Sequence, residues 1–173
     1  RFAGANGSVR DMGERDRLER ELRASEERFR FLIENSPDII FAVDAAGAFT
    51  YVSDGIRRSL GYEPEELVGR AMWSIIEYAP GDTPGLRFGQ LRDDPSLELT
   101  NRLMLRHADG RTVPFEVSSV GISRDGEFAG IQGAARDISE RERLEQELRV
   151  SEERYRFLVE NSPDIIFSTD ADG

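Results

Sequence analysis

Residues 60–69 read LGYEPEELVG and place two helix boundaries within ten positions of the chain. Gly61 is predicted to end one short helix, because a glycine beyond the last helical residue takes the left-handed conformation without steric cost. Pro64 is predicted to open the next helix, since proline is favoured in a first helical turn, and Gly69 closes it. We therefore expect short helices joined by tight turns in the middle of the chain.

On the N-terminal side of this segment, two apolar runs predict a β-hairpin. Residues 39–44 (IIFAVD) and 49–52 (FTYV) are the strands, separated by an Ala-Ala-Gly turn. Asp54 or Ser53 is expected to cap the short helix that runs through Leu60, because both side chains can accept a hydrogen bond from a helix N-terminus.

On the C-terminal side, residues 72–77 are predicted to form one or two further helical turns, and residues 86–91 a short helix within a Pro- and Gly-rich loop. Three strand patterns follow, separated by two Asp-Gly turns. With the hairpin, they predict an α+β domain with one five-stranded antiparallel sheet and short helices on one face. The three strands cover residues 97–105, 113–122 and 128–138.

The chain contains an internal repeat. Residues 9–47 recur as residues 135–173, at an offset of 126 without a gap. By direct count about 28 of the 39 aligned positions are identical. The second copy stops just after its first strand pattern, so we expect the chain to be cut from a longer tandem array.

Each copy of the repeat carries an apolar stripe with 4-3-4-3 spacing, which is typical of the seam of a coiled coil. The other helix faces are almost wholly Glu and Arg, with acid-first pairs four apart such as Glu19–Arg23 and Glu145–Arg149. We favour a parallel two-stranded coiled coil that forms a homodimer; the alternative is a helix that lies on its own domain. The seam positions are Leu18, Leu22, Ser25, Phe29 and Leu32, and then Leu144, Leu148, Ser151, Tyr155 and Leu158.

The composition excludes several classes of function. The 173 residues include 34 acidic and 23 basic ones, and a net charge of −11 disfavours nucleic acid and anionic lipid as partners. The absence of Cys and Lys excludes disulfides, thiol catalysis and Schiff-base chemistry. A single histidine, His107, cannot make a multi-histidine metal site. No apolar run reaches the ~18 residues of a membrane span. The segment is expected to be cytoplasmic, without membrane contact.

The element order and four motifs resemble the PAS domain, a sensory module common in bacterial signalling proteins. The motifs are NSPD at 35–38, LGYEPEELVG at 60–69, DG at 109–110 and RDIS at 136–139. The last is similar to the Asp-Ile-Thr motif at the end of the family's domain, with Ser139 in place of Thr. The expected organisation is the end of a preceding module or linker at 1–13, a signalling helix at 14–35, the PAS domain at 36–138, a second signalling helix at 139–161 and the first strand of a second, truncated PAS domain at 162–173.

The resemblance implies a pocket between the sheet and the helices that holds haem, flavin, a small metabolite or nothing. Flavin photoreceptors of the family use a cysteine, which this chain lacks, and Gln132 precedes Asp137 by five residues where the family's ring-binding glutamine stands two away. Residues 86–91 offer no histidine for haem, and His107 beside a hairpin turn is expected to be exposed. Haem and flavin are therefore disfavoured, and no cofactor is expected.

Arg87, Asn101 and Gln132 are the polar candidates for orienting a small ligand. The alternative is that none of them binds a ligand: Arg87 is solvated, and the two amides form hydrogen bonds with the sheet or with water. A set of apolar residues is expected to line the pocket, with plain core packing as the alternative for the whole set. These residues are Phe41, Leu60, Trp73, Ile76, Phe88, Leu105 and Phe115.

Catalytic motifs are missing from the sequence: there is no phosphate loop, nucleophile elbow or paired-histidine motif, so the fragment is predicted not to be an enzyme. By resemblance it is a sensory relay module of a two-component or cyclic-dinucleotide system, with a histidine kinase or diguanylate cyclase as output and neighbouring PAS domains as partners. The relay is expected to pass through Asp137, Ile138 and Ser139 to the following helix, where Ser139 and Glu142 predict a capping box. The alternative is a ligand-free dimerisation and spacer module.

Overall fold

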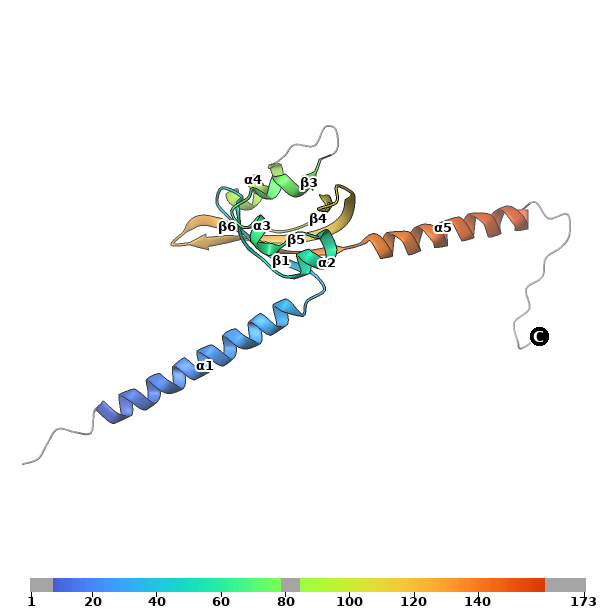
Figure 1. The fold of residues 1–173 in the computed structure, drawn as a ribbon. Helices are drawn as coiled ribbons and strands as arrows, with labels where there is room; N and C mark the ends of the chain where they lie inside the picture. The colour runs from blue at the N-terminus through green and yellow to red at the C-terminus, as the bar shows by residue number, and fades with distance from the viewer. Residues whose placement is uncertain (1–7, 79–84, 161–173) are drawn as a thin grey trace, which may run out of the picture.

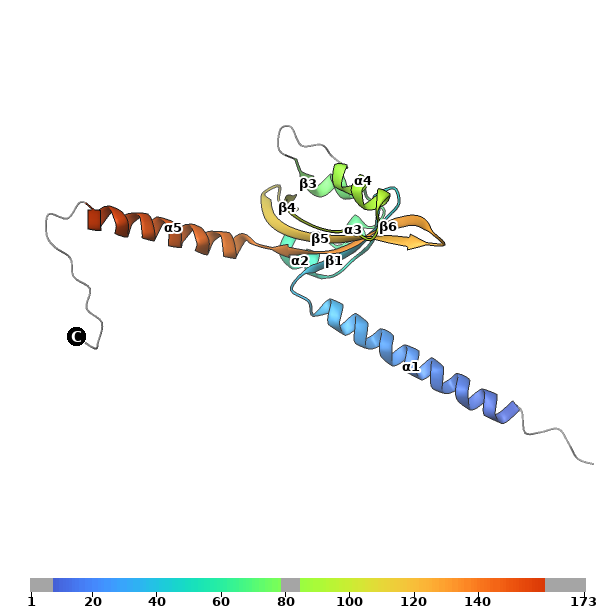
Figure 2. The same ribbon diagram turned by 180° about the vertical axis from the view of Figure 1, so that it is seen from behind.

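Two long helices project from a small sheet domain (Figure 1 and, from behind, Figure 2). The computed structural model describes residues 8–78 and 85–160. Helix α1 spans Ser8–Glu34 and α5 spans Ser139–Glu160. α1 thus begins before the predicted start at residue 14. Residues 135–137 are extended because neighbouring strands pair with them, whereas the equivalent residues 9–11 continue the helix. The strand predicted within 162–173 lies outside the described residues.

Six antiparallel strands form one sheet in the order β2-β1-β6-β5-β4-β3. The α+β fold with an antiparallel sheet is confirmed, but the prediction of five strands misses one. Residues 72–77 were expected to be helical throughout, yet the chain straightens after one 3-10 turn, and Ile76 and Glu77 pair with the edge of β4. The strands are β1 Ile39–Asp44, β2 Phe49–Val52, β3 Ile76–Glu77, β4 Glu98–Arg106, β5 Thr112–Arg124 and β6 Glu127–Asp137.

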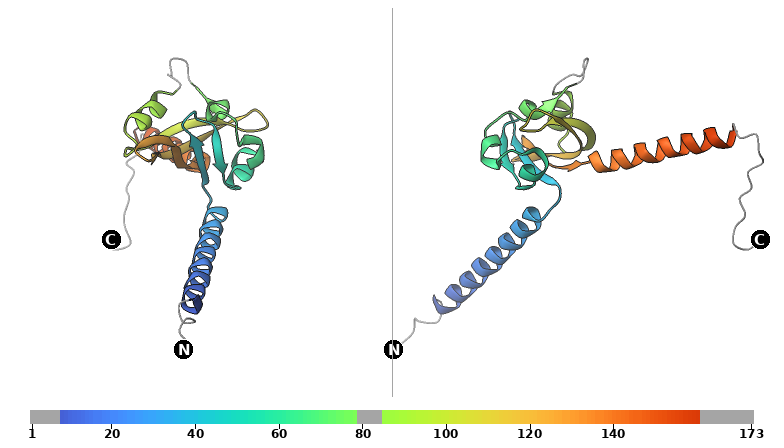
Figure 3. Two further views of the ribbon diagram at one scale, coloured as in Figure 1. Left: turned by 90° about the vertical axis from the view of Figure 1, so that its left-hand side faces the viewer. Right: turned by 45° about the vertical axis from the view of Figure 1, so that its right-hand side comes forward.

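Short helices cover one face of the sheet (Figure 3). Gly61 ends the first of them in the left-handed conformation and Pro64 begins the next, as the segment 60–69 predicts. A capping box between Glu63 and Glu66, which was not predicted, supports the start of this second helix. Asp54 stands at the predicted N-cap position but makes no side-chain cap hydrogen bond, and the buried Ser53 hydroxyl instead accepts the Ile40 N–H at 2.9 Å. The helices are α2 Gly55–Leu60, α3 Pro64–Leu67, the 3-10 turn η1 Met72–Ile75 and α4 Leu86–Asp93.

The core lies between these helices and the inward face of the sheet. Alternate residues of β1, β5 and β6 point inward, and the outward ones are more exposed. Phe115, Leu60 and Leu67 have no exposed surface, which marks the most tightly enclosed part of the core. The four central strands therefore present one face to the helices and the other to solvent.

The left-handed conformation costs a non-glycine residue about 1–2 kcal/mol. Gly61→Ala is expected to lower the free energy of unfolding by more than this amount. Gly61 has φ +72°, and an added Cβ would lie 2.9 Å from Cε1 of His107. Gly69 is the matched control, because it has φ +84° and nothing within 4 Å of its added Cβ. Urea denaturation of both variants measures the difference; equal losses would show that the His107 contact costs nothing.

Candidate functional site

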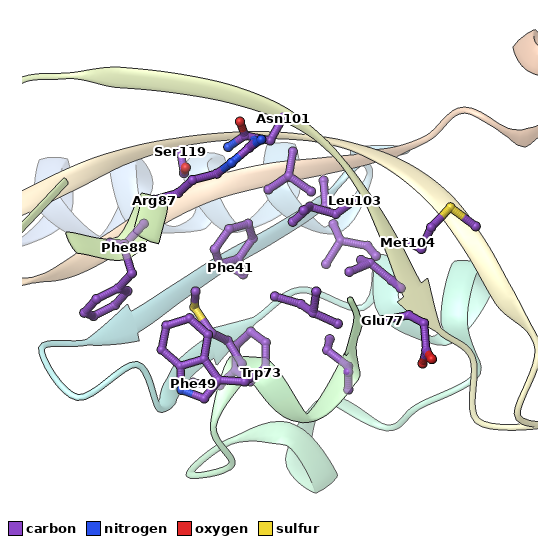
Figure 4. Close-up of a pocket in the computed structure, with 18 of the residues that line it drawn as sticks. Phe41, Phe49, Trp73, Glu77, Arg87, Phe88, Asn101, Leu103, Met104 and Ser119 are labelled. Atoms are coloured by element: carbon purple, nitrogen blue, oxygen red, sulfur yellow. The ribbon is translucent and has the colours of Figure 1, made fainter. Parts of the chain in front are cut away.

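A cavity of about 530 Å³ lies between the sheet and the helices η1 and α4 (Figure 4). Its walls come from the inward faces of β1, β4, β5 and β6 on one side and from η1, β3 and α4 on the other. The volume falls within the ~300–1,000 Å³ typical of small-molecule sites, and the walls are mostly apolar. The site is therefore large enough for a small organic ligand.

Seven of the ten predicted pocket residues border this cavity. They are Phe41, Trp73, Ile76, Arg87, Phe88, Asn101 and Leu105.

The other three predicted pocket residues do not border it, and each fails for a physical reason. Leu60 and Phe115 point inward but have no exposed surface, because neighbouring core side chains surround them completely. Gln132 follows the buried Ile131 along β6, so strand alternation turns it to the exposed outer face. Leu103 and Ser119 line the cavity but were not predicted to do so. Each lies two residues from another inward-facing residue of its strand, so side-chain alternation would have identified both.

Polar side chains gather at one end of the cavity. Arg87 from α4, Asn101 from β4 and Ser119 from β5 lie together there in Figure 4. Asn101 and Ser119 are diagonal neighbours on one sheet face, since Ser119 pairs with Leu99 in the ladder. Glu77 lies at the opposite end, where its carboxylate binds Arg106 at 2.6 Å.

Aromatic rings form one wall of the cavity. Trp73 and Phe88 meet edge to face with their centroids 5.3 Å apart, and Phe88 meets Phe128 in the same way at 5.6 Å. Phe41 lies across the cavity on β1, where the absence of a side chain at Gly133 lets its ring approach the sheet: a Cβ there would lie 2.8 Å from the ring. These rings offer flat apolar surfaces to a ligand.

His107 is more buried than its place beside a hairpin turn led us to expect. Its side chain is only 15% exposed, because the ring packs against Gly61. Its Nδ1 accepts the Asp109 N–H at 3.1 Å. The Arg111 N–H bonded to the Asp109 carboxylate lowers the pKa of that carboxyl, and His107 adds to the effect. His107 does not line the cavity, and its role here is to hold the hairpin.

The junction between β6 and α5 is capped by Asp137. Its Oδ1 accepts the Ser139 N–H at 2.8 Å, and the buried Ile138 donates its N–H to the Pro114 carbonyl of β5 at 3.1 Å. The capping box predicted between Ser139 and Glu142 was wrong: Ser139 is already the first helical residue, and the Glu142 carboxylate binds Arg102 of β4 instead. The first turn of α5 is thus tied to two strands of the sheet.

Charged residues of alternating sign cross the outer face of the sheet beside this junction. We call Asp38, Arg136, Glu116, Arg102 and Glu142 the charge row. Arg136 binds Asp38 through two hydrogen bonds of 2.8 and 2.9 Å, and Arg102 lies 2.8 Å from Glu142. Glu116 is the ladder partner of both Arg102 and Arg136. The Asp38 hydrogen bond raises the pKa of Arg136, with a smaller contribution from Glu116.

The charge row joins the two ends of the domain. Asp38 directly precedes β1 and lies four positions beyond the end of α1, and Glu142 lies in the first turn of α5. The loop after α1 is held as well, since Arg58 donates to the Ser36 carbonyl at 2.9 Å. The contacts of both helix junctions therefore lie on the same face of the sheet.

The predicted seam side chains on α1 and α5 are exposed. The aromatic and leucine residues range from 51% exposed for Leu144 to 66% for Tyr155. The predicted acid-first ion pairs do not form among the described side chains; arginine precedes glutamate instead, as in Arg15–Glu19 and Arg141–Glu145. Either order contributes only a few tenths of a kcal/mol, so a face of alternating Glu and Arg does not select one.

The sheet order, the short helices on one face and the cavity between them define a class of α+β ligand-pocket domain. The family model of the PAS fold matches residues 33–143, and the chain belongs to this family. Over the part of the chain that the structure describes, no helix is long and apolar enough to cross a bilayer.

Solved structures agree with this fold, and one curated relative is similar in sequence. The PAS domain of an HTR-like protein from Haloarcula marismortui is 27% identical, with a TM-score of 0.60 over 71% of this chain and 99% of that one. A domain of a sensory box sensor histidine kinase/response regulator from Geobacter sulfurreducens is 24% identical, with a TM-score of 0.54 over 67% and 96%. The uncharacterized protein y4lL of Sinorhizobium fredii is 28% identical over 82% of this chain, which spans only 17% of that relative's length.

Proposed function

We propose that this chain is a non-catalytic sensory module that passes a change in its cavity to α5, as part of a multidomain signalling protein. The observation that carries the proposal is the charge row, which lies on strands whose opposite faces border the cavity. One sheet thus separates a ligand-sized space from the contacts that hold the output helix.

The shortest connection runs through β4. Asn101 and Leu103 face the cavity, and Arg102 between them points to the other face, because side chains alternate along a strand. Arg102 holds Glu142 of α5. A ligand that shifts β4 therefore shifts the base of α5 without any intermediate element.

The arginines of the charge row are 64% exposed, whereas the side chains of Asp38 and Glu142 are only 16% and 28% exposed. Water at the arginine end keeps such pairs to about 1 kcal/mol each, so the row can rearrange at modest cost. A ligand that binds one arrangement roughly tenfold more tightly supplies about 1.4 kcal/mol, which is enough to change the populated arrangement. The Asp137 cap then decides whether the first turn of α5 follows the sheet or frays.

The proposal is tested by filling the cavity and reading out α5. Leu103→Phe is expected to change amide hydrogen exchange at residues 139–145 by roughly three- to tenfold, which corresponds to about 1 kcal/mol of local stability. With Asp137→Ala in the background, the same cavity change is expected to have no further effect there.

Asp94→Ala is the matched control for this experiment. The Asp94 carboxylate accepts the Ser96 N–H at 3.0 Å, as the Asp137 carboxylate accepts the Ser139 N–H, but Asp94 is far from α5 in the sequence. In the Asp94→Ala background, the response to Leu103→Phe should persist. If Leu103→Phe leaves α5 exchange unchanged, or if the response survives Asp137→Ala, the relay does not exist.

Within the parent protein, we propose a homodimer through α1 and α5, with neighbouring PAS domains and a histidine kinase or diguanylate cyclase as output. The support is the exposed seam and the similarity to a domain of a sensor histidine kinase. A second candidate function is a ligand-free spacer that only sets dimerisation. The exposed seam supports the spacer as well as it supports the sensory relay. If α5 does not respond to Leu103→Phe, only the spacer remains supported.

A further inference from the structure

We propose that the cavity binds an apolar carboxylic acid, with its carboxylate held by Arg87, Asn101 and Ser119 and its apolar body against the aromatic wall. This inference rests on the proposed sensory function and names the ligand class for it. Its starting point is the contrast within the cavity between one polar end and otherwise apolar walls (Figure 4).

The polar end has unused hydrogen-bonding capacity. Among residues 8–78 and 85–160, the side chains of Arg87 and Asn101 have no hydrogen-bond or ion-pair partner. Ser119 donates only a long hydrogen bond, 3.5 Å, to the Leu99 carbonyl. The other charged groups near the cavity are already paired, Glu77 with Arg106 and Arg102 with Glu142. The exposed Arg87 guanidinium and the half-buried Asn101 amide therefore converge with a weakly bonded Ser119 hydroxyl on a site for an acceptor from outside the protein.

The charge of the site favours a carboxylate over other anions. One guanidinium offers a planar pair of N–H donors that matches the two oxygens of a carboxylate and balances a single negative charge. A phosphate dianion would need a second cation, and no second unpaired cation lies at this end among the described residues. Asn101 and Ser119 lie on the sheet side, opposite Arg87 on α4, so they can complete the coordination from the other side.

The rest of the cavity determines the body of the ligand. Trp73, Phe88 and Phe41 present ring edges and faces across a space of about 530 Å³. This space suits a single ring or a medium-length alkyl chain attached to the acid. Because Arg87 belongs to α4 and Asn101 to β4, a bound carboxylate would bridge the helix layer to the strand that carries Arg102. The ligand would thus act directly on the strand that contacts α5.

The test compares acids with amides of the same shape. The probes are 4-phenylbutyrate against 4-phenylbutyramide and octanoate against octanamide, with Trp73 fluorescence and titration calorimetry as readouts. Trp73 is the only tryptophan in the chain, and it borders the cavity, so its emission reports this site alone. We expect at least one acid to bind roughly tenfold more tightly than its amide, because hydrogen bonds to a charged group are stronger.

Two variants separate the site from general electrostatics. Arg87→Gln is expected to remove the preference for the acid while leaving amide binding unchanged. Arg92→Gln is the matched control on the same helix, because Arg92 pairs with Asp93 at 3.4 Å and does not line the cavity; it should keep the preference. Equal binding of acid and amide, an acid preference that survives Arg87→Gln, or no binding of either acid would overturn the proposal.

The outcome also separates this inference from the relay. If neither acid binds but Leu103→Phe still alters exchange in α5 in an Asp137-dependent way, the ligand class is wrong and the sensory function stands. If an acid binds but α5 does not respond to Leu103→Phe, the ligand class stands and the relay is wrong.

Discussion

Phe115→Ala is expected to lower the free energy of unfolding by about 3–5 kcal/mol, the usual cost of removing a large aromatic side chain from a closed core. Phe115 has no exposed surface and does not border the cavity, so its truncation opens a new void that its neighbours cannot fill. Urea denaturation followed by far-UV circular dichroism measures the loss.

Phe88→Ala is the matched control, since it removes the same atoms from a residue that borders the cavity and is only partly buried. Folding buries less apolar surface of Phe88 than of Phe115, and a space already exists beside Phe88. We therefore expect the free energy of unfolding to fall by about 1–2 kcal/mol. If the two variants lose equal stability, Phe115 does not belong to a closed core separate from the cavity.

Leu144→Glu combined with Leu148→Glu is expected to convert a dimer into a monomer. Both leucines are more than half exposed in the single chain, and burying each is worth about 1.5–3 kcal/mol. Four leucines per dimer then contribute roughly 6 kcal/mol or more, a change of over four orders of magnitude in the dissociation constant. Sedimentation velocity of the wild type and the variant measures the state directly.

The control for this pair changes the charge equally but leaves the seam intact. Val150→Glu with Gln146→Glu adds the same two negative charges to α5 at positions outside the 4-3-4-3 series. The control should remain dimeric. The coiled-coil prediction is wrong if the wild-type chain sediments as a monomer. It is also wrong if the control dissociates as fully as the seam variant.

Local signals in the sequence were sufficient for much of the fold. Gly61 and Pro64 mark helix boundaries because their backbone preferences act within one or two residues, and the structure has both boundaries where expected. The Asp-Gly turns and the alternation of the last three strands depend equally on short-range chemistry, and they correspond to β4, β5 and β6. Strand β3 was missed because two residues at a sheet edge carry no periodicity; only the neighbouring β4 makes them a strand.

The site depended more strongly on packing. Parity along a strand predicts which side chains face inward, but whether an inward residue borders a cavity, as Asn101 does, or is enclosed, as Phe115 is, depends on neighbours from other elements. The charge row is the clearest case: Asp38 and Arg136 are 98 residues apart, and Arg102 and Glu142 are 40 apart. No local pattern links such pairs, because strand order and register alone bring them together. Short-range backbone and hydropathy preferences thus specify the elements, and long-range assembly creates the cavity and its connection to α5.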